Sequence, residues 1–303
     1  VRVDEGRRWG AEILAAAGVV DPQRDVDLLL EEVLYRPWAH ILAHPEGLLS
    51  PSEEDRFREL LSRRASREPM AYILGEKGFW GRNFAVGPGC LIPRDDTEAL
   101  METVLGVFPG GLFVDWGTGS GCLAATLALE RPASRGVAVE ASPRALVWAR
   151  RNLRSLGVLG RVDLVHGKAP EDLSLAPGVV DLVVSNPPYI PSLRLAGLMP
   201  EVGRFEPAEA LDGGDDGMDF YRMICPWAST VLKEGGYLAV EVGDEAQAAW
   251  LRDHGGASLR WQRFFYDLKG EVRGVVWKKT SPVAYNRPGS SSLRLQGAGE
   301  SRT

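Results

Sequence analysis

The first part of the chain repeats apolar residues every three to four positions, which is the spacing of one buried helix face. Gly18 ends the first such stretch, and Asp21-Pro22 opens the second with a capping residue followed by proline. Ser50-Pro51 opens a further helix in the same way, with acidic residues in its first turn. We therefore expect a helical bundle over residues 1–78, of a kind suited to docking a substrate.

Beyond the bundle the pattern changes to short apolar runs separated by glycine and proline. The runs 79–86 and 90–92 lie on either side of Gly87-Pro88-Gly89, which predicts a β-hairpin with its turn at these three residues. This hairpin, within residues 79–93, is the expected linker between two domains. A helix follows it, and three neighbouring residues are able to cap that helix: Asp95, Asp96 and Thr97.

From residue 112 onward, apolar runs of strand length alternate with helical periodicity, which is the pattern of a parallel sheet covered on both faces. Strands are expected at 112–116, 136–140, 162–166, 180–185 and 236–242, with a closing pair at 261–266 and 272–277. Helices are expected near 120–130, 143–156, 216–232 and 244–254. The predicted fold class is α/β, with a Rossmann-like doubly wound sheet over residues 94–280. Residues 281–303 are rich in Gly, Ser and Arg, have little to bury, and are predicted to be disordered.

The composition limits what this chain can do. A length of 303 residues suggests about two domains, and a net charge of -6 argues against a stable nucleic-acid partner, since such binders are usually basic. No apolar run approaches the roughly 20 residues of a membrane helix, so no membrane partner is expected. The three cysteines are scattered without paired spacing, which favours a reducing, cytoplasmic location.

His40 and His44 lie four residues apart and could face each other on a helix, so a metal site has to be considered. No third ligand stands near them, and Pro45 ends the segment. Packing or surface roles are favoured, and no metal is predicted.

A glycine-rich turn follows the strand at 112–116 and leads directly into a helix; it consists of Gly117, Thr118, Gly119, Ser120 and Gly121. Glycines let a ligand approach the backbone, and the helix N-terminus offers free N–H donors. Dinucleotide enzymes use a similar turn, so the turn alone is a weak signal. Asp115 precedes it, and a carboxylate there would oppose a pyrophosphate but suits the positive charges of S-adenosylmethionine.

Two more polar residues stand at the ends of later strands. Glu140 ends the strand at 136–140, where a carboxylate can accept hydrogen bonds from both hydroxyls of a ribose. Asn186 follows the strand at 180–185. Either acid alone could equally cap a helix or face solvent. Because ligands of open parallel sheets bind at the carboxyl ends of the strands, the ordered set points to an S-adenosylmethionine-dependent methyltransferase.

Asn186-Pro-Pro-Tyr189 forms a rigid corner, because consecutive prolines fix φ and remove two N–H donors. For Asn-Pro alone, a strand that simply ends in a proline turn is the simpler interpretation. We expect the Asn186 side-chain oxygen and the Pro187 carbonyl to accept both hydrogens of a planar amino or amide group, which raises electron density on its nitrogen. Pro188 belongs to the same substrate site, and Tyr189 is expected to wall or stack against the flat group.

The order of motifs along the chain resembles one known family. The helical module, Gly78-Phe-Trp-Gly81, Leu91–Glu98, the glycine turn, Asn186–Tyr189 and Arg204-Phe-Glu-Pro207 follow one another over about residues 1–280. This order is similar to that of the peptide chain release factor N(5)-glutamine methyltransferases, which are class I methyltransferases. The resemblance implies S-adenosylmethionine as cofactor and the glutamine of the Gly-Gly-Gln loop in class 1 peptide chain release factors as substrate.

The resemblance also implies roles for residues outside the corner. Arg94, Glu98, Glu206 and Pro207 are expected to build the substrate pocket. Arg94 and Glu98 could equally form an ion pair one helical turn apart.

On the cofactor side, the resemblance assigns binding roles to Lys168 and Asn186 beside the glycine turn and the two acids. The chain departs from the usual family pattern at Trp116, and at Glu140, where aspartate is more frequent. Gly167 also replaces an acidic residue that often contacts the adenine amine, so we expect backbone groups to take a larger share of adenine recognition.

Other functions use similar motifs. A ribosomal-protein glutamine methyltransferase has a similar scaffold but usually lacks the Ile92–Glu98 segment. A nucleic-acid methyltransferase acting on adenine or guanine amino groups uses the same corner but should carry basic stripes with interleaved aromatics. A non-catalytic cofactor-binding subunit has no need of an intact corner, and a nicotinamide dehydrogenase does not fit the glycine spacing.

Overall fold

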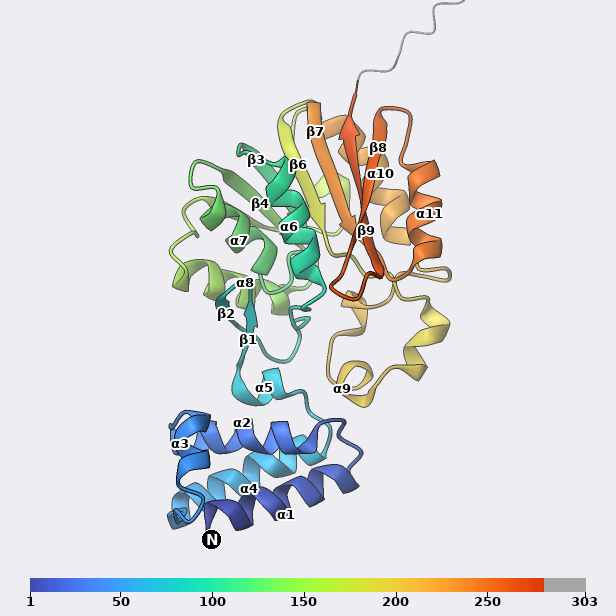
Figure 1. Ribbon diagram of the computed structural model, residues 1–303. Coiled ribbons are helices and arrows are strands. Elements are labelled where there is room, and N and C mark those ends of the chain that lie inside the picture. The colour runs from blue at the N-terminus through green and yellow to red at the C-terminus, as the bar shows by residue number, and fades with distance from the viewer. Residues whose placement is uncertain (281–303) are drawn as a thin grey trace, which may run out of the picture.

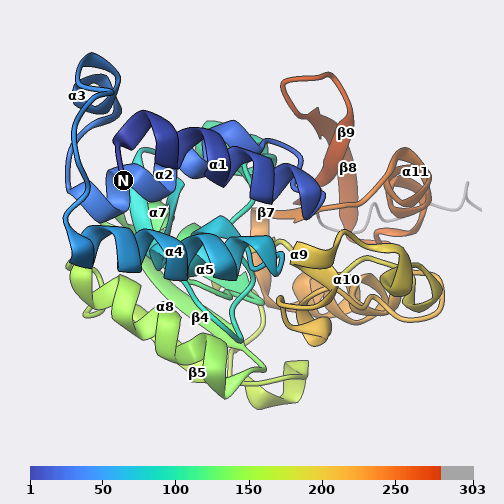
Figure 2. The ribbon, with the colours of Figure 1, turned by 90° about the horizontal axis from the view of Figure 1, so that it is seen from below.

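The N-terminal part of the computed structural model, which describes residues 1–280, is a helical bundle at one end of the molecule, below the sheet in Figure 1 and facing the viewer in Figure 2. Its helices are α1 (Val3–Ala16), α2 (Pro22–Leu34), α3 (Trp38–Ala43), α4 (Pro51–Ala65) and α5 (Met70–Leu74). Their apolar stripes close on one core that includes Leu14, Leu29 and Phe57. Ser50 and Glu53 form the reciprocal capping box at the start of α4. The predicted bundle is confirmed; the predicted disordered tail, 281–303, lies outside the described residues.

The larger part of the molecule contains a seven-stranded sheet in the order β5-β4-β3-β6-β7-β9-β8. Its strands are β3 (Leu112–Trp116), β4 (Arg135–Glu140), β5 (Val162–His166), β6 (Val180–Ser185), β7 (Leu232–Glu241), β8 (Leu259–Tyr266) and β9 (Val272–Lys279). Strands β3 to β7 pair in parallel, and β9 runs antiparallel to both β7 and β8. The doubly wound sheet and its closing pair of strands are confirmed.

Helices cover both faces of this sheet, and strand residues alternate between the two resulting cores. Phe113 packs in one core with α6 (Thr97–Val107) and α7 (Cys122–Glu130), whereas its neighbour Val114 packs in the other. The second core contains α10 (Asp219–Val231) and α11 (Glu245–His254); α8 (Pro143–Ser155) and the short α9 (Pro200–Gly203) complete the helices. Because these strands pair in parallel, the carboxyl ends of β3, β4, β5 and β6 lie together at one edge of the sheet.

The hairpin between the bundle and the sheet differs from the prediction. Its strands are β1 (Glu76–Phe79) and β2 (Arg82–Ala85), and its turn is Trp80-Gly81, with φ of 50° and 69°. The predicted turn at Gly87-Pro88-Gly89 is wrong. The Trp80 N–H donates to the Glu98 carboxylate at 2.6 Å, so a residue of α6 stabilises the left-handed tryptophan. Gly87 instead packs against α8, where a Cβ would come within 2.4 Å of Trp148.

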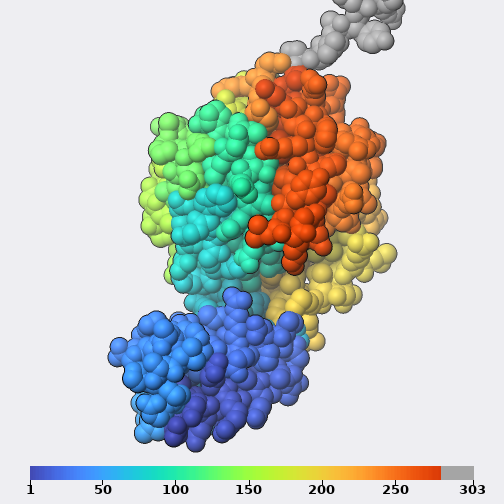
Figure 3. All heavy atoms as spheres, in the orientation of Figure 1, coloured from blue at the N-terminus to red at the C-terminus, as the bar shows by residue number. Residues whose placement is uncertain are grey.

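A cluster of charged side chains joins the bundle to the sheet domain. Glu201 of α9 accepts hydrogen bonds from Arg64 at 3.0 Å and from Arg67 at 2.7 Å, and Arg64 also pairs with Asp25 at 2.7 Å. We call these four residues the junction cluster. Their side chains are 8% to 15% exposed. Figure 3 shows the segment that contains α9 in contact with both the bundle and the body of the molecule.

Candidate active site

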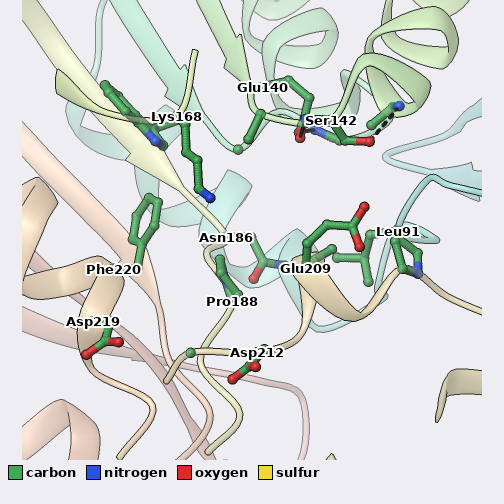
Figure 4. A pocket seen from close by; sticks show the side chains of 18 of the residues that line it. Leu91, Glu140, Ser142, Lys168, Asn186, Pro188, Glu209, Asp212, Asp219 and Phe220 are labelled. Atoms are coloured by element: carbon green, nitrogen blue, oxygen red, sulfur yellow. Dashed lines mark hydrogen bonds between the residues drawn. The ribbon is translucent and has the colours of Figure 1, made fainter. Parts of the chain in front are cut away.

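A cavity of about 520 Å³ opens at the carboxyl ends of the central strands, a size within the range of small-molecule sites (Figure 4). Among the predicted site residues, seven line it: Gly117, Gly119, Glu140, Lys168, Asn186, Pro188 and Pro207. Lys168 and Phe220 lie on one side of the cavity, and Glu209 and Leu91 on the other. The location agrees with the general rule that ligands of open parallel sheets bind where the strand order reverses, here between β3 and β6.

The glycine turn is held against β4 through its backbone. The N–H groups of Gly117 and Thr118 both donate to the Val139 carbonyl at 2.9 Å, and the Gly119 N–H donates to Glu140 at 2.8 Å. Gly117 and Gly119 have φ of 74° and 55°, and a Cβ at either position would meet no atom within 4 Å. The backbone therefore faces open cavity, as a close ligand approach requires.

The rest of the turn is buried beneath this surface. Gly121 has φ of 80° and caps α7, where a Cβ would meet Ala149 at 3.3 Å. Thr118 and Ser120 are buried and do not line the cavity. These three residues shape the turn from below.

Glu140 presents its carboxylate at the cavity wall. One oxygen accepts from the Gly119 N–H, and the other accepts from the Ser142 N–H at 2.9 Å. Burial raises the pKa of the Glu140 carboxyl, while the two backbone donors act in the opposite direction. Each carboxylate oxygen has a further lone pair, so hydrogen bonds to a ribose remain available.

Asp115 lies under the turn and not among the residues that line the cavity. Its Oδ2 accepts from the Thr118 hydroxyl at 2.6 Å and from the Ala124 N–H at 3.1 Å. Its Oδ1 is buried and has no partner among the described residues. Burial raises the pKa of this carboxyl to about 7. The predicted contact of Asp115 with a positively charged ligand therefore stays a prediction, and its observed role is to hold the turn.

The Asn186–Tyr189 corner follows β6 and turns its first side chain toward the cavity. Asn186 Nδ2 donates to the Thr97 hydroxyl at 2.9 Å. Within residues 1–280, neither Asn186 Oδ1 nor the Pro187 carbonyl accepts a hydrogen bond, so both oxygens retain their accepting capacity; Asn186 lines the cavity, whereas Pro187 is buried and does not. Tyr189 does not line the cavity, and its hydroxyl lies 3.4 Å from a Glu241 oxygen. Its predicted stacking on the substrate stays a prediction.

Two residues that sequence reasoning did not place in the site stand behind Asn186. Thr97 is the first residue of α6, where a capping role had been considered, but its hydroxyl donates to Glu241 at 2.7 Å. Glu241 ends β7 and is 1% exposed. Strand β7 pairs with β6, the strand that leads into the corner, so Glu241 lies beside the corner. The sequence alone does not give this strand order.

Arg94 and Glu206 form one unit at the edge of the site. The Arg94 guanidinium donates to Glu206 Oε1 at 2.6 Å, and the Ile92 N–H donates to Glu206 Oε2 at 2.9 Å. The alternative Arg94–Glu98 ion pair is not formed, because Glu98 accepts from Trp80. Pro207 lines the cavity, whereas Arg94 and Glu206 do not. Their predicted role in substrate binding is left open by this geometry.

The predicted recognition of adenine by backbone groups near Gly167 stays a prediction. Asp172 lies against Gly167, where an added Cβ would come within 3.0 Å of the Asp172 Cβ. The Asp172 carboxylate accepts from the N–H groups of Lys168 and Ala169 at 2.6 and 2.9 Å. A side chain at position 167 would therefore compete with Asp172 for space.

Comparisons with known proteins give the chain its family. A family model described as the PrmC N-terminal domain matches residues 5–75, and one described as a precorrin methyltransferase domain matches residues 89–181. The release factor glutamine methyltransferase of Rhodospirillum rubrum is 41% identical over 275 residues, 89% of this chain and 83% of that protein. The one from Geobacter sulfurreducens is 44% identical over 236 residues, 78% of this chain and 82% of that protein. The chain belongs to the release factor glutamine methyltransferase family.

The resemblance inferred from the order of motifs is thus confirmed, and the relatives span both the helical bundle and the sheet of this family member. Among solved structures, a methyltransferase from Pyrococcus furiosus is 19% identical with a TM-score of 0.48, and the match covers 75% of this chain and 100% of that one.

Several lining residues of this family member carried no signal in the sequence. They come from loops after the strands and from α10, and they include Ser142, Glu209, Asp212, Asp219, Phe220 and Met223.

Within residues 1–280, no group of three His, Cys, Asp or Glu side chains is placed to hold a metal ion; the His40 and His44 rings lie 4.6 Å apart. Over the same range, no helix has the length and apolar character to cross a bilayer.

Proposed function

We propose that this chain transfers a methyl group from S-adenosylmethionine to the side-chain amide nitrogen of the glutamine in the Gly-Gly-Gln motif of class 1 peptide chain release factors. The observation that carries the proposal is the corner, where Asn186 Oδ1 and the Pro187 carbonyl are two open acceptors for the two hydrogens of one amide. The names of the relatives support release factors as the substrate. Translation termination places the reaction in the cytoplasm, and the three buried free cysteines suit a reducing compartment.

The residues of the cavity fit S-adenosylmethionine. Gly117 and Gly119 leave the backbone open to a close ligand, and Glu140 lines the cavity as an acceptor for ribose hydroxyls. Asp115, with its unpartnered Oδ1, supplies negative charge beneath the turn for the positive end of the cofactor. Lys168 and Phe220 line the side of the cavity opposite Glu209 and Leu91. When bound, S-adenosylmethionine supplies the electrophilic methyl group.

The corner makes a poor nucleophile reactive. A glutamine amide nitrogen delocalises its lone pair into the carbonyl, and it regains the lone pair only as it pyramidalises. Asn186 Oδ1 and the Pro187 carbonyl accept from its two hydrogens and hold the developing positive charge more strongly than the ground state. The two prolines keep both acceptors in place, which contributes positioning of the kind worth about 7 kcal/mol in favourable cases. The methylated nitrogen is acidic, so no strong general base is required.

The helical bundle is proposed to dock the release factor. A second hollow of about 580 Å³ lies between the bundle, the hairpin and the 92–95 segment, with Arg64, Met70 and Arg94 in its wall. The Arg94–Glu206 pair lies between this hollow and the cavity, because Arg94 lines the first and Pro207 the second. A substrate loop that follows this route would reach the corner from the bundle side.

Mass spectrometry of the product tests the proposal. The full chain is incubated with a purified class 1 release factor and S-adenosylmethionine, and the Gly-Gly-Gln peptide should gain one methyl group on the glutamine. A release factor with that glutamine replaced by alanine is the control and should gain none. Parallel reactions contain ribosomal proteins, tRNA, ribosomal RNA and DNA. Methylation of any of these, with an unmodified release factor, would contradict the proposed substrate.

A further inference from the structure

A buried chain of side-chain hydrogen bonds stands behind Asn186 and draws on several elements of the sheet domain. Asn186 Nδ2 donates to Thr97 Oγ1 at 2.9 Å, and Thr97 Oγ1 donates to Glu241 Oε2 at 2.7 Å. The Tyr189 hydroxyl lies 3.4 Å from Glu241 Oε1. Thr97 is 2% exposed and Glu241 is 1% exposed, so water does not compete for these bonds.

The direction of each bond in this chain follows from the donors that the groups possess. An ionised carboxylate only accepts, so the single hydrogen of the Thr97 hydroxyl must go to Glu241. The Thr97 oxygen is then left as an acceptor, and only the NH₂ end of the Asn186 amide can satisfy it. The opposite end of the amide, Oδ1, is thereby turned away from Thr97.

We propose that Thr97 and Glu241 are positioning residues that orient the Asn186 amide with its oxygen toward the substrate. The inference rests on the proposed function, in which Oδ1 accepts a hydrogen of the substrate amide. With the Asn186 amide turned over, its NH₂ group would face the NH₂ group of the glutamine, and two donors would meet. Thr97 and Glu241 exclude that arrangement although neither of them lines the cavity.

The orientation depends on the charge of Glu241. Burial and, to a smaller extent, Asp96 raise the pKa of this carboxyl, whereas Thr97, Tyr189 and Arg273 act in the opposite direction, and the resulting pKa is about 7. Tyr221 of α10 also faces it, and donates to the Glu241 backbone carbonyl at 2.7 Å.

Below this pKa, a protonated Glu241 can donate to Thr97, and the Thr97 hydrogen is then free to turn toward Asn186. The amide loses its preferred orientation, so turnover should fall as the pH is lowered through about 7.

The test compares four variants of the full chain with the wild type in release-factor methylation: Thr97→Val, Thr97→Ser, Glu241→Gln and the control Thr126→Val. Thr97→Val removes the acceptor for Asn186 Nδ2, and Thr97→Ser keeps it. Thr126 is a fully buried threonine of α7 whose hydroxyl has no partner among the described residues, so it matches the loss of one buried hydroxyl away from the site. For each protein, kcat and KM for the release factor are measured over pH, and S-adenosylmethionine affinity is measured by calorimetry.

We expect Thr97→Val to lower kcat roughly tenfold, the equivalent of one net hydrogen bond, with cofactor affinity retained and the pH dependence near 7 lost. Thr97→Ser should keep the wild-type kcat and pH profile, and Thr126→Val should behave as the wild type. Glu241→Gln can donate as well as accept, so its kcat should be reduced several-fold and should not change with pH through 7.

A Thr97→Val protein with the wild-type kcat and pH profile would overturn the inference. So would a loss that Thr126→Val reproduces, or a loss confined to cofactor affinity. If Thr97→Val does not fold, Thr97→Ser and Glu241→Gln decide the question by their pH profiles. A wild-type protein that leaves the release factor unmodified would instead refute the proposed function, so the two failures are distinguishable.

Discussion

The two walls of the cavity are built in different ways. The cofactor wall, formed by residues 117–121 and Glu140, is held by backbone N–H groups of the turn, which donate to the Val139 carbonyl and the Glu140 carboxylate of the neighbouring strand β4. The substrate wall presents Leu91, Asn186 and Pro188 to the cavity and is backed by residues 92–97, Pro187, Tyr189 and Glu206. It is held by side-chain hydrogen bonds between residues that are distant in sequence. Thr97 and Glu241 are 144 residues apart, Ile92 and Glu206 are 114 apart, and Asn186 and Thr97 are 89 apart.

The difference determines what a substitution should do. On the cofactor wall the bonds to Val139 join backbone groups, and the Glu140 carboxylate also accepts from the N–H groups of Gly119 and Ser142. A changed Glu140 side chain therefore loosens the ligand-binding turn as well as losing its own contact with the ligand. On the substrate wall each buried group satisfies another, so removing one leaves a partner without a hydrogen bond. Cofactor-wall variants should therefore act mainly on affinity, and substrate-wall variants on turnover or stability.

Replacement of Asn186 should give the largest effect. Asn186→Ala removes one acceptor for the developing charge, so kcat for release-factor methylation should fall on the order of 100-fold to 1000-fold. Asn186→Asp keeps an oxygen but cannot donate to Thr97, and it should lose most activity as well. Calorimetry should show retained S-adenosylmethionine affinity in both. Near-normal turnover by both variants would remove Asn186 from the mechanism.

Replacement of Glu140, on the cofactor wall, should lower the affinity for S-adenosylmethionine and leave kcat nearly unchanged, the reverse of what is expected for Asn186. Glu140→Ala loses the proposed hydrogen bonds to the ribose, and a net loss of about 1.5 to 3 kcal/mol should lower S-adenosylmethionine affinity roughly tenfold to 100-fold. At saturating cofactor, kcat should change little. Glu140→Asp, which keeps the charge at a shorter reach, is the matched control. A kcat loss as large as that of Asn186→Ala would abolish the distinction between the walls.

The contrast also explains which parts of the molecule could be predicted from its sequence. The glycine turn and Glu140 belong to consecutive strands, and strand–helix periodicity predicts that their carboxyl ends meet. The turn at Trp80-Gly81 could not be predicted in this way, because glycine and proline favour residues 87–89 and the deciding contact comes from Glu98. The Thr97–Glu241 pair could not be predicted for the same reason, because it depends on which helix packs beside which strand.

Replacement of Glu206 should show how much stability is lost when donors on the substrate wall are left without their acceptor. Glu206→Ala removes the acceptor of both the Ile92 N–H and the Arg94 guanidinium, so the free energy of unfolding should fall by about 2 kcal/mol. Urea denaturation measures it, and Glu102→Ala on the exposed face of α6 is the control, with a change within about 0.5 kcal/mol. Equal stability of the two variants would mean that the 91–94 segment does not depend on this carboxylate.

A substitution in the junction cluster should have the smallest effect of the four, and it tests whether the substrate wall extends to the helical bundle. Glu201→Gln keeps the shape and one acceptor but removes the charge that Arg64 and Arg67 share, so hydrogen bonds to a charged acceptor become bonds to a neutral one and stability should fall by about 1 kcal/mol. A less firmly held bundle should raise KM for the release factor by roughly fivefold, the equivalent of about 1 kcal/mol, and leave S-adenosylmethionine affinity unchanged. Glu245→Gln, an exposed carboxylate of α11, is the control. If KM does not move while stability falls, the cluster is a structural joint, and the substrate wall ends at the Arg94–Glu206 pair.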